Sequence, residues 1–171
     1  MENDQIKLIE ALASLLETKP FDEIAAKDVA QTAGVPVARF GYWYHDMYAL
    51  LFALFESEER ALDATGIKPE SAGEAFVLSV SFALRHPDAA RNVCRSLASG
   101  VYKRHVAALA TKYFSDAVLQ RLGAKEATDH ERDAVRFLRA AAVGLSSKEL
   151  LGAADVKEEV ERYADFFDKI Y

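Results

Sequence analysis

The sequence predicts an all-α protein of about nine helices. Apolar residues recur at helical spacing through most of the 171-residue chain. The four prolines, Pro20, Pro36, Pro69 and Pro87, fall where a helix is expected to begin or end. No β-hairpin signature, internal repeat or low-complexity linker interrupts this pattern. Hydrophobic residues make up 51% of the chain, which is enough for a packed core.

The first part of the chain predicts one amphipathic helix, two short helices and a long one. The first helix is expected over residues 3–18, where apolar residues recur every three or four positions. Short helices are expected over residues 26–33 and 36–44, with Gly34 in the turn between them. A long helix is then expected over residues 47–65, with its leucines facing inward.

Capping signals mark the helices of the remaining chain. Ser71 and Glu74 form a capping box, as do Thr128 and Glu131. Pro87 is expected in the first turn of a helix, where its missing N–H does no harm. The later helices are therefore expected over 71–85, from Pro87 onward, over 101–122, over 128–144 and from about Asp155 to the end.

Charge is distributed unevenly along the chain. Residues 1–51 hold four bases and eight acids, a net charge of −4. Residues 85–112 hold six bases and one acid, a net charge of +5. The basic surface is therefore expected in the middle of the chain, where it faces an anionic ligand, solvent or the acidic N-terminal segment.

The two short helices and their turn predict a helix-turn-helix. In such a unit the second helix lies in the major groove of DNA and the first crosses the phosphate backbone. Ala30, Val35 and Phe40 are expected to hold the two helices together. Gly34 supplies the backbone freedom of the tight turn.

The segment "IEALASLLETKPFDEIAAKDVAQTAGVPVARFGYWYHDMYALL" resembles the N-terminal domain of the tetracycline-repressor (TetR) family of bacterial regulators. The resemblance lies in the alanine-rich first helix, the F-x-x-I turn, D-V-A-x-x-A-G-V and the aromatic run before D-x-x-x-L-L. It covers about the first third of the chain. It implies a homodimer with a DNA-binding domain over residues 1–47 and an effector-binding and dimerisation domain over residues 48–171.

Several positions depart from the family pattern. In the recognition segment, Pro36 replaces the usual Ser, Arg39 the Thr and Gly41 the Tyr. After them, Tyr44 replaces the usual Phe and Met47 the Lys. Ala25 replaces the Thr that usually caps the helix before this segment. The apolar frame is retained, whereas several hydroxyls and one ammonium that bind phosphate are absent. The segment therefore predicts weakened phosphate contacts.

Two functions remain open from the sequence. In the first, the protein is a TetR-like regulator that binds a double-stranded DNA operator as a dimer under the control of a small-molecule effector. In the second, it no longer binds DNA specifically and acts as a ligand-sensing or partner-binding module. Among the candidate DNA contacts given next, the aromatic residues could instead pack inside the fold, and Arg39 could instead be an ordinary surface residue. The candidate DNA contacts are Lys27, Pro36, Val37, Arg39, Tyr42, Trp43 and His45.

The family resemblance also implies an effector pocket and a dimer interface. The apolar and aromatic pocket candidates could instead be plain core residues, and the two arginines could instead lie on a solvated surface. The small residues of the last two long helices suit close packing against a second copy. The pocket candidates are Phe76, Val80, Arg91, Arg95, Tyr102 and Tyr113. The interface candidates are Ala134, Leu138, Ala141, Leu145, Tyr163 and Phe167.

No enzymatic motif is present. The four histidines lack metal-ligand spacing, and HExxH, GxSxG and phosphate-binding glycine loops are missing. The single cysteine, Cys94, can form no internal disulfide, which suits a reducing cytoplasm, and it is expected to pack in a helix rather than act as a nucleophile. We therefore expect a cytoplasmic protein without catalysis, metal, cofactor, signal peptide or membrane span.

Overall fold

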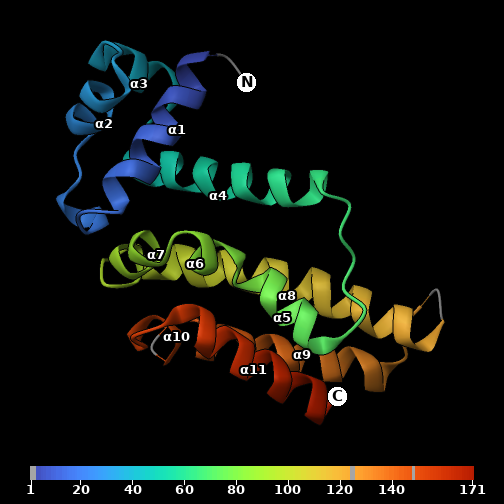
Figure 1. Ribbon diagram of the computed structural model, residues 1–171. Helices are drawn as coiled ribbons and strands as arrows, with labels where there is room; N and C mark the ends of the chain where they lie inside the picture. Colours follow the sequence, from blue (N-terminus) through green and yellow to red (C-terminus); the bar gives the residue numbers. More distant parts are fainter. Residues whose placement is uncertain (1–2, 124–125, 148) are drawn as a thin grey trace. The chain divides into compact units, whose positions relative to one another are not determined.

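A computed structural model describes residues 3–123, 126–147 and 149–171 (Figure 1). These residues form helices and connecting turns, without a β-strand, which confirms the all-α prediction. The chain divides into two compact units. The first unit comprises the chain up to Ala64 together with His86–Tyr102, and the second comprises Thr65–Arg85 and Lys103–Tyr171. In the described part of the chain, no helix is long and apolar enough to cross a bilayer.

The first unit is built around an amphipathic helix and the helices that cover its apolar face. Its core includes Leu8 and Leu12 from the first helix, Phe40 from the third and Leu51 from the fourth, all at most 5% exposed. Burial of these side chains supplies the main stabilisation of the unit. The elements are α1 (Asn3–Leu16), a 3-10 turn (Phe21–Glu23), α2 (Ala26–Ala33), α3 (Val37–Trp43), α4 (Met47–Ala64) and α7 (Pro87–Cys94).

Helix α7 joins the first unit although it lies far along the sequence. The side-chain amide of Asn92 donates to the Leu16 carbonyl over 2.8 Å, which satisfies an acceptor at the C-terminal end of α1. His86 Nδ1 lies 2.9 Å from a carboxylate oxygen of Glu17. These contacts attach the chain after Arg85 to the end of α1.

The second unit has an aromatic core. Phe76 of α5 stacks on Phe167 of α11, with ring centroids 4.8 Å apart, and Phe114 lies 5.4 Å from Phe167. All three side chains are fully buried. The elements are α5 (Ala72–Ser79), α6 (Ser81–Arg85), the greater part of α8 (Ser99–Leu122), α9 (Asp129–Leu145), α10 (Glu149–Gly152) and α11 (Val156–Ile170).

Most predicted helix starts are confirmed. Thr128 Oγ1 accepts from the Glu131 N–H, and Asp155 caps α11 by accepting from Lys157 and Glu158. Ser71 accepts from the Glu74 N–H as expected, but the Glu74 carboxylate accepts from Glu70 instead of from Ser71.

Two features differ from the predicted helices. The helix expected over 71–85 is divided at Val80, whose φ of −109° and ψ of 16° are not helical. Just before it, the Ser79 hydroxyl donates to the Ala75 carbonyl over 2.6 Å, a back-bond that competes with regular helix geometry. The short helix α10 was not predicted, because four residues are too few for an apolar period.

Candidate nucleic-acid interface

Helices α2 and α3 are joined by the tight turn that the sequence predicts. Gly34 has φ of 66° and ψ of 32°, in the left-handed region that favours glycine. The Val35 N–H donates to the Ala30 carbonyl over 3.0 Å and closes the end of α2. The chain then enters α3 after Pro36, whose φ of −59° suits a position just before a helix.

The start of α2 retains half of a capping box. The Asp28 carboxylate accepts from the Ala25 N–H over 3.0 Å, but Ala25 has no side-chain acceptor to return the bond. That backbone hydrogen bond, together with the Lys19 ammonium 3.5 Å away, lowers the pKa of Asp28. Helix α2 is therefore fixed at its start by a carboxylate rather than by a hydroxyl.

One face of α3 packs inside the first unit. Phe40 and Tyr44 are buried, with ring centroids 5.9 Å apart, and burial raises the pKa of the Tyr44 hydroxyl. Trp43 is half-buried, packs edge-to-face against Tyr42 and has its indole nitrogen buried. Since a buried indole N–H is not presented to DNA, this geometry favours the packing role for Trp43.

The large exposed side chains of α3 are mostly apolar. Val37 is 52% exposed and Tyr42 is 69% exposed, and Pro36 precedes them at the surface. Apolar side chains in this position can contact thymine methyl groups, and the Tyr42 hydroxyl can reach a phosphate or a base edge. The outward face of α3 is therefore shaped for apolar contact more than for hydrogen bonding.

The polar candidates around α3 differ in how they are held. Lys27 is exposed at the start of α2. His45 is mostly exposed, and its Nε2 lies 3.0 Å from the Asp46 carboxylate. Arg39 Nε donates to Asp4 Oδ2 of α1 over 2.6 Å, and its guanidinium lies 5.5 Å from the Tyr42 ring centroid. This ion pair was not predicted, because no short spacing connects residues 35 positions apart.

The six effector-pocket candidates divide between the two units. In the second unit, Phe76, Val80 and Tyr113 are buried core side chains. In the first unit, Tyr102 is buried, and burial raises the pKa of its hydroxyl. On α7 of the same unit, Arg91 pairs with Asp88 over 2.8 Å, and the chain is exposed at Arg95. The structure therefore does not assign these six residues to one compact unit.

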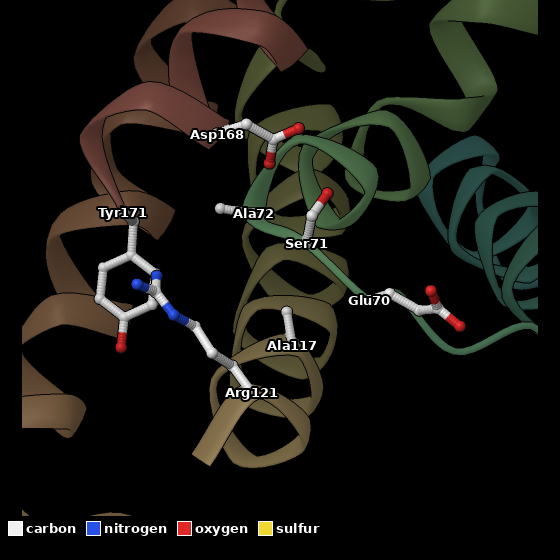
Figure 2. A pocket seen from close by; sticks show the side chains of 7 residues that line it. All are labelled: Glu70, Ser71, Ala72, Ala117, Arg121, Asp168 and Tyr171. Carbon is white, nitrogen blue, oxygen red and sulfur yellow. The ribbon is translucent and has the colours of Figure 1, made fainter.

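A pocket of about 300 Å³ lies within the second unit (Figure 2). Its floor includes two small residues, Ala72 and Ala117. On one side the Arg121 guanidinium lies 5.1 Å from the Tyr171 ring centroid. On the other side Asp168 Oδ1 accepts from the Gly73 N–H over 2.6 Å. The full lining is Glu70, Ser71, Ala72, Ala117, Arg121, Asp168 and Tyr171.

Gly73 allows α5 and α11 to approach closely beside this pocket. A Cβ at Gly73 would lie 2.6 Å from the Ala164 carbonyl oxygen and 2.5 Å from an Asp168 oxygen. Because one of these atoms belongs to the backbone, a larger residue would have to move α11. The wall that carries Asp168 is therefore fixed by a glycine contact.

The interface candidates divide into buried and half-exposed groups. Leu138 and Phe167 lie in the core of the second unit, because α9 and α11 turn these side chains inward. The other four, Ala134, Ala141, Leu145 and Tyr163, are half-buried. The same helices expose large apolar side chains beside these candidates: Phe166 and Ile170 of the apolar last helix are 53% and 43% exposed, and Phe137 of α9, which the sequence did not single out, is 65% exposed. A hollow of about 370 Å³ beside them is lined by Leu145, Arg162, Tyr163, Phe166 and Lys169.

The architecture of a helix-turn-helix after α1, followed by α4 and a second helical unit, is the TetR-type fold. The chain is similar in structure to "Dihydroxyacetone kinase operon activator DhaS", with a TM-score of 0.74 at 12% identity over 98% of this chain and 97% of that one. It is also similar to a TetR transcriptional regulator from Rhodococcus sp. RHA1, with a TM-score of 0.59 at 19% identity over 96% of this chain and 94% of that one. No family model and no curated protein sequence matches the chain.

Proposed function

We propose that the protein is a TetR-like transcriptional regulator that binds an operator as a homodimer and responds to a small-molecule effector. The observation that carries this proposal is the pair α2 and α3, joined at Gly34 with one face of α3 packed and the other exposed. The two similar structures described above are named as an operon activator and a transcriptional regulator, which supports a regulatory rather than a catalytic role. We assign DNA binding to residues 1–47, and effector binding and dimerisation to residues 48–171.

Selection from a random duplex pool tests operator binding. The purified protein is incubated with the pool at low salt, and bound duplexes are recovered and sequenced. We expect enrichment of a palindromic site, because a two-fold dimer presents two copies of α3. Recovery of unenriched sequences would leave only nonspecific binding, and the partner-binding function would replace this one.

We propose that the exposed apolar face of α9 and α11 binds a second copy of the chain. Phe137 on α9 and Phe166 on α11 are large apolar side chains at the surface, beside the hollow that Tyr163 lines. Phe166→Glu is expected to shift sedimentation from dimer toward monomer. Ala154→Glu adds the same charge at an exposed position just before α11 and is expected to leave the dimer intact. Equal behaviour of the two variants would place the interface elsewhere.

We propose that the pocket lined by α5, α8 and α11 binds the effector. Arg121 offers a planar donor group to a carboxylate or phosphate, and its stacking on Tyr171 limits its motion. Figure 2 shows the Glu70 carboxylate pointing away from Arg121. The effector would then carry one anionic group on Arg121 and a hydroxyl or amine toward Asp168.

A panel of small carboxylic acids and phosphate esters tests this pocket. A compound that raises the melting temperature of the wild type, and not that of Arg121→Gln, would support the site. A compound that stabilises both proteins equally would bind elsewhere.

A further inference from the structure

We propose that Asp4 competes with DNA phosphate for Arg39, so that operator binding requires the Asp4–Arg39 ion pair to open. This inference rests on the proposed function, because it concerns how the same surface meets DNA. Asp4 lies at the start of α1, outside the helix-turn-helix, yet the ion pair would give it an influence on DNA affinity.

The geometry holds the Arg39 guanidinium from two sides. Arg39 Nε donates to Asp4 Oδ2 over 2.6 Å, a short charge-assisted hydrogen bond. The guanidinium also lies 5.5 Å from the Tyr42 ring centroid, within the range of a cation–π contact. Arg39 is thus bound to α1 and to its own helix at the same time.

A carboxylate and a phosphate bind the same donor edge of arginine. Both are anions that accept parallel N–H bonds from Nε and a terminal nitrogen of the guanidinium. Since Asp4 already accepts from Nε, a phosphate reaches that edge only after the carboxylate leaves it. Asp4 and DNA are therefore alternative partners of this edge of Arg39.

The exposure of the pair sets the strength of this competition. The side chains of Arg39 and Asp4 are 43% and 23% exposed, so solvent screens their attraction. An ion pair that water screens in this way holds its partners weakly. A phosphate can therefore displace Asp4, and the ion pair reduces DNA affinity without preventing binding.

The charge balance of the segment increases the effect. Residues 1–51 carry a net charge of −4, and Arg39 is the sole arginine among them. Lys19 already lies 3.5 Å from the Asp28 carboxylate. Neutralising Asp4 both weakens its hold on Arg39 and removes one negative charge next to the proposed phosphate contact.

The test measures binding of the full-length protein to a labelled random duplex pool and to any selected duplex, by fluorescence anisotropy at several salt concentrations. Asp4→Asn preserves the shape of the side chain and removes its charge. We expect it to bind DNA about two- to fivefold more tightly at low salt, the factor that corresponds to an exposed ion pair. We expect the slope of log affinity against log salt to stay nearly unchanged, because Arg39 contacts phosphate in both complexes and the same number of counterions leaves the DNA.

Three further variants separate the competition from other effects. Glu10→Gln removes one exposed charge from α1 at a distance from Asp4 and is expected to change affinity less. Asp4→Glu keeps the charge and is expected to bind like the wild type. In Arg39→Gln the addition of Asp4→Asn is expected to produce no comparable gain, since no guanidinium remains to release.

Each other result overturns a defined part of the proposal. Weaker binding by Asp4→Asn, with an unchanged circular dichroism spectrum, would mean that Asp4 positions Arg39 for DNA. Equal gains in Asp4→Asn and Glu10→Gln, or a gain that persists without Arg39, would mean a general charge effect. No binding by any variant at low salt would reject the proposed function itself, and the competition with it.

Discussion

Arg39 in the first unit and Arg121 in the second are held in different ways. Each guanidinium lies over a tyrosine ring, at 5.5 Å from the Tyr42 centroid and 5.1 Å from the Tyr171 centroid. Arg39 is also bound by a carboxylate, whereas Arg121 has no ion pair within the described residues. The two arginines therefore share an aromatic contact, but only the charge of Arg39 is balanced by a carboxylate, and Arg121 can bind an anion.

The two units also differ in what their aromatic residues do. In the first unit, α3 turns Phe40 inward and exposes Tyr42. In the second, Phe76 and Phe167 stack in the core that supports the wall of the α5–α8–α11 pocket. The proposed binding residues of the first unit therefore lie on an exposed helix surface, whereas those of the second unit line a pocket beside a packed core.

The largest expected effect concerns that core. Phe76→Ala removes a fully buried ring and is expected to cost about 3–5 kcal/mol of unfolding free energy. Val37→Ala, on the exposed face of α3, is expected to change stability by less than about 0.5 kcal/mol. Urea denaturation followed by circular dichroism measures both. A similar loss for both variants would contradict the assignment of Val37 to a surface.

A smaller effect compares the two tyrosines under the arginines. Tyr42→Leu and Tyr171→Leu each remove a cation–π contact at an exposed arginine, expected to cost about 0.5–1 kcal/mol. Only Tyr171→Leu is expected to weaken binding of an anionic effector, because only Arg121 is proposed to meet one. Calorimetric titration and thermal melts measure the two consequences. Loss of effector binding in Tyr42→Leu, and not in Tyr171→Leu, would contradict the assignment of the effector to Arg121.

The smallest effect is a pH dependence at the start of α2. The pKa of Asp28 is lowered from its ordinary value of 3.8, first by the hydrogen bond from the Ala25 N–H. A carboxyl group with a lowered folded-state pKa stabilises the fold above its unfolded pKa, and that contribution is lost as pH falls through the folded value. Thermal melts of wild type and Asp28→Asn should therefore differ near neutral pH and converge in acid. A difference that grows in acid would have the wrong sign.

Local signals in the sequence predicted most of the helices. Gly34, Pro87 and Thr128 act through their own backbone or a neighbour three residues away, so their roles follow from spacing alone. The break between α5 and α6 at Val80 was not predicted, because Ser79 also fits an uninterrupted apolar helix.

Burial and long-range pairing were harder to predict. Phe166 and Phe167 are adjacent and equally apolar, yet one is exposed and the other fully buried, because packing on Phe76 decides the rotation of α11. The Asp4–Arg39 pair depends on how α1 and α3 pack, which no local spacing encodes. The candidate DNA surface was therefore predictable as a segment but not in its electrostatics.

The salt dependence of binding to the selected duplex tests the central claim most directly. Fluorescence anisotropy from low to physiological salt gives the affinity and its slope, with a shuffled duplex as control. We predict a clear preference for the selected duplex and a shallow slope, because the apolar face of α3 contacts bases while few cations reach phosphate. Met47→Lys should then steepen the slope by about one. Failure to bind at low salt, or equal binding to both duplexes, would contradict the account.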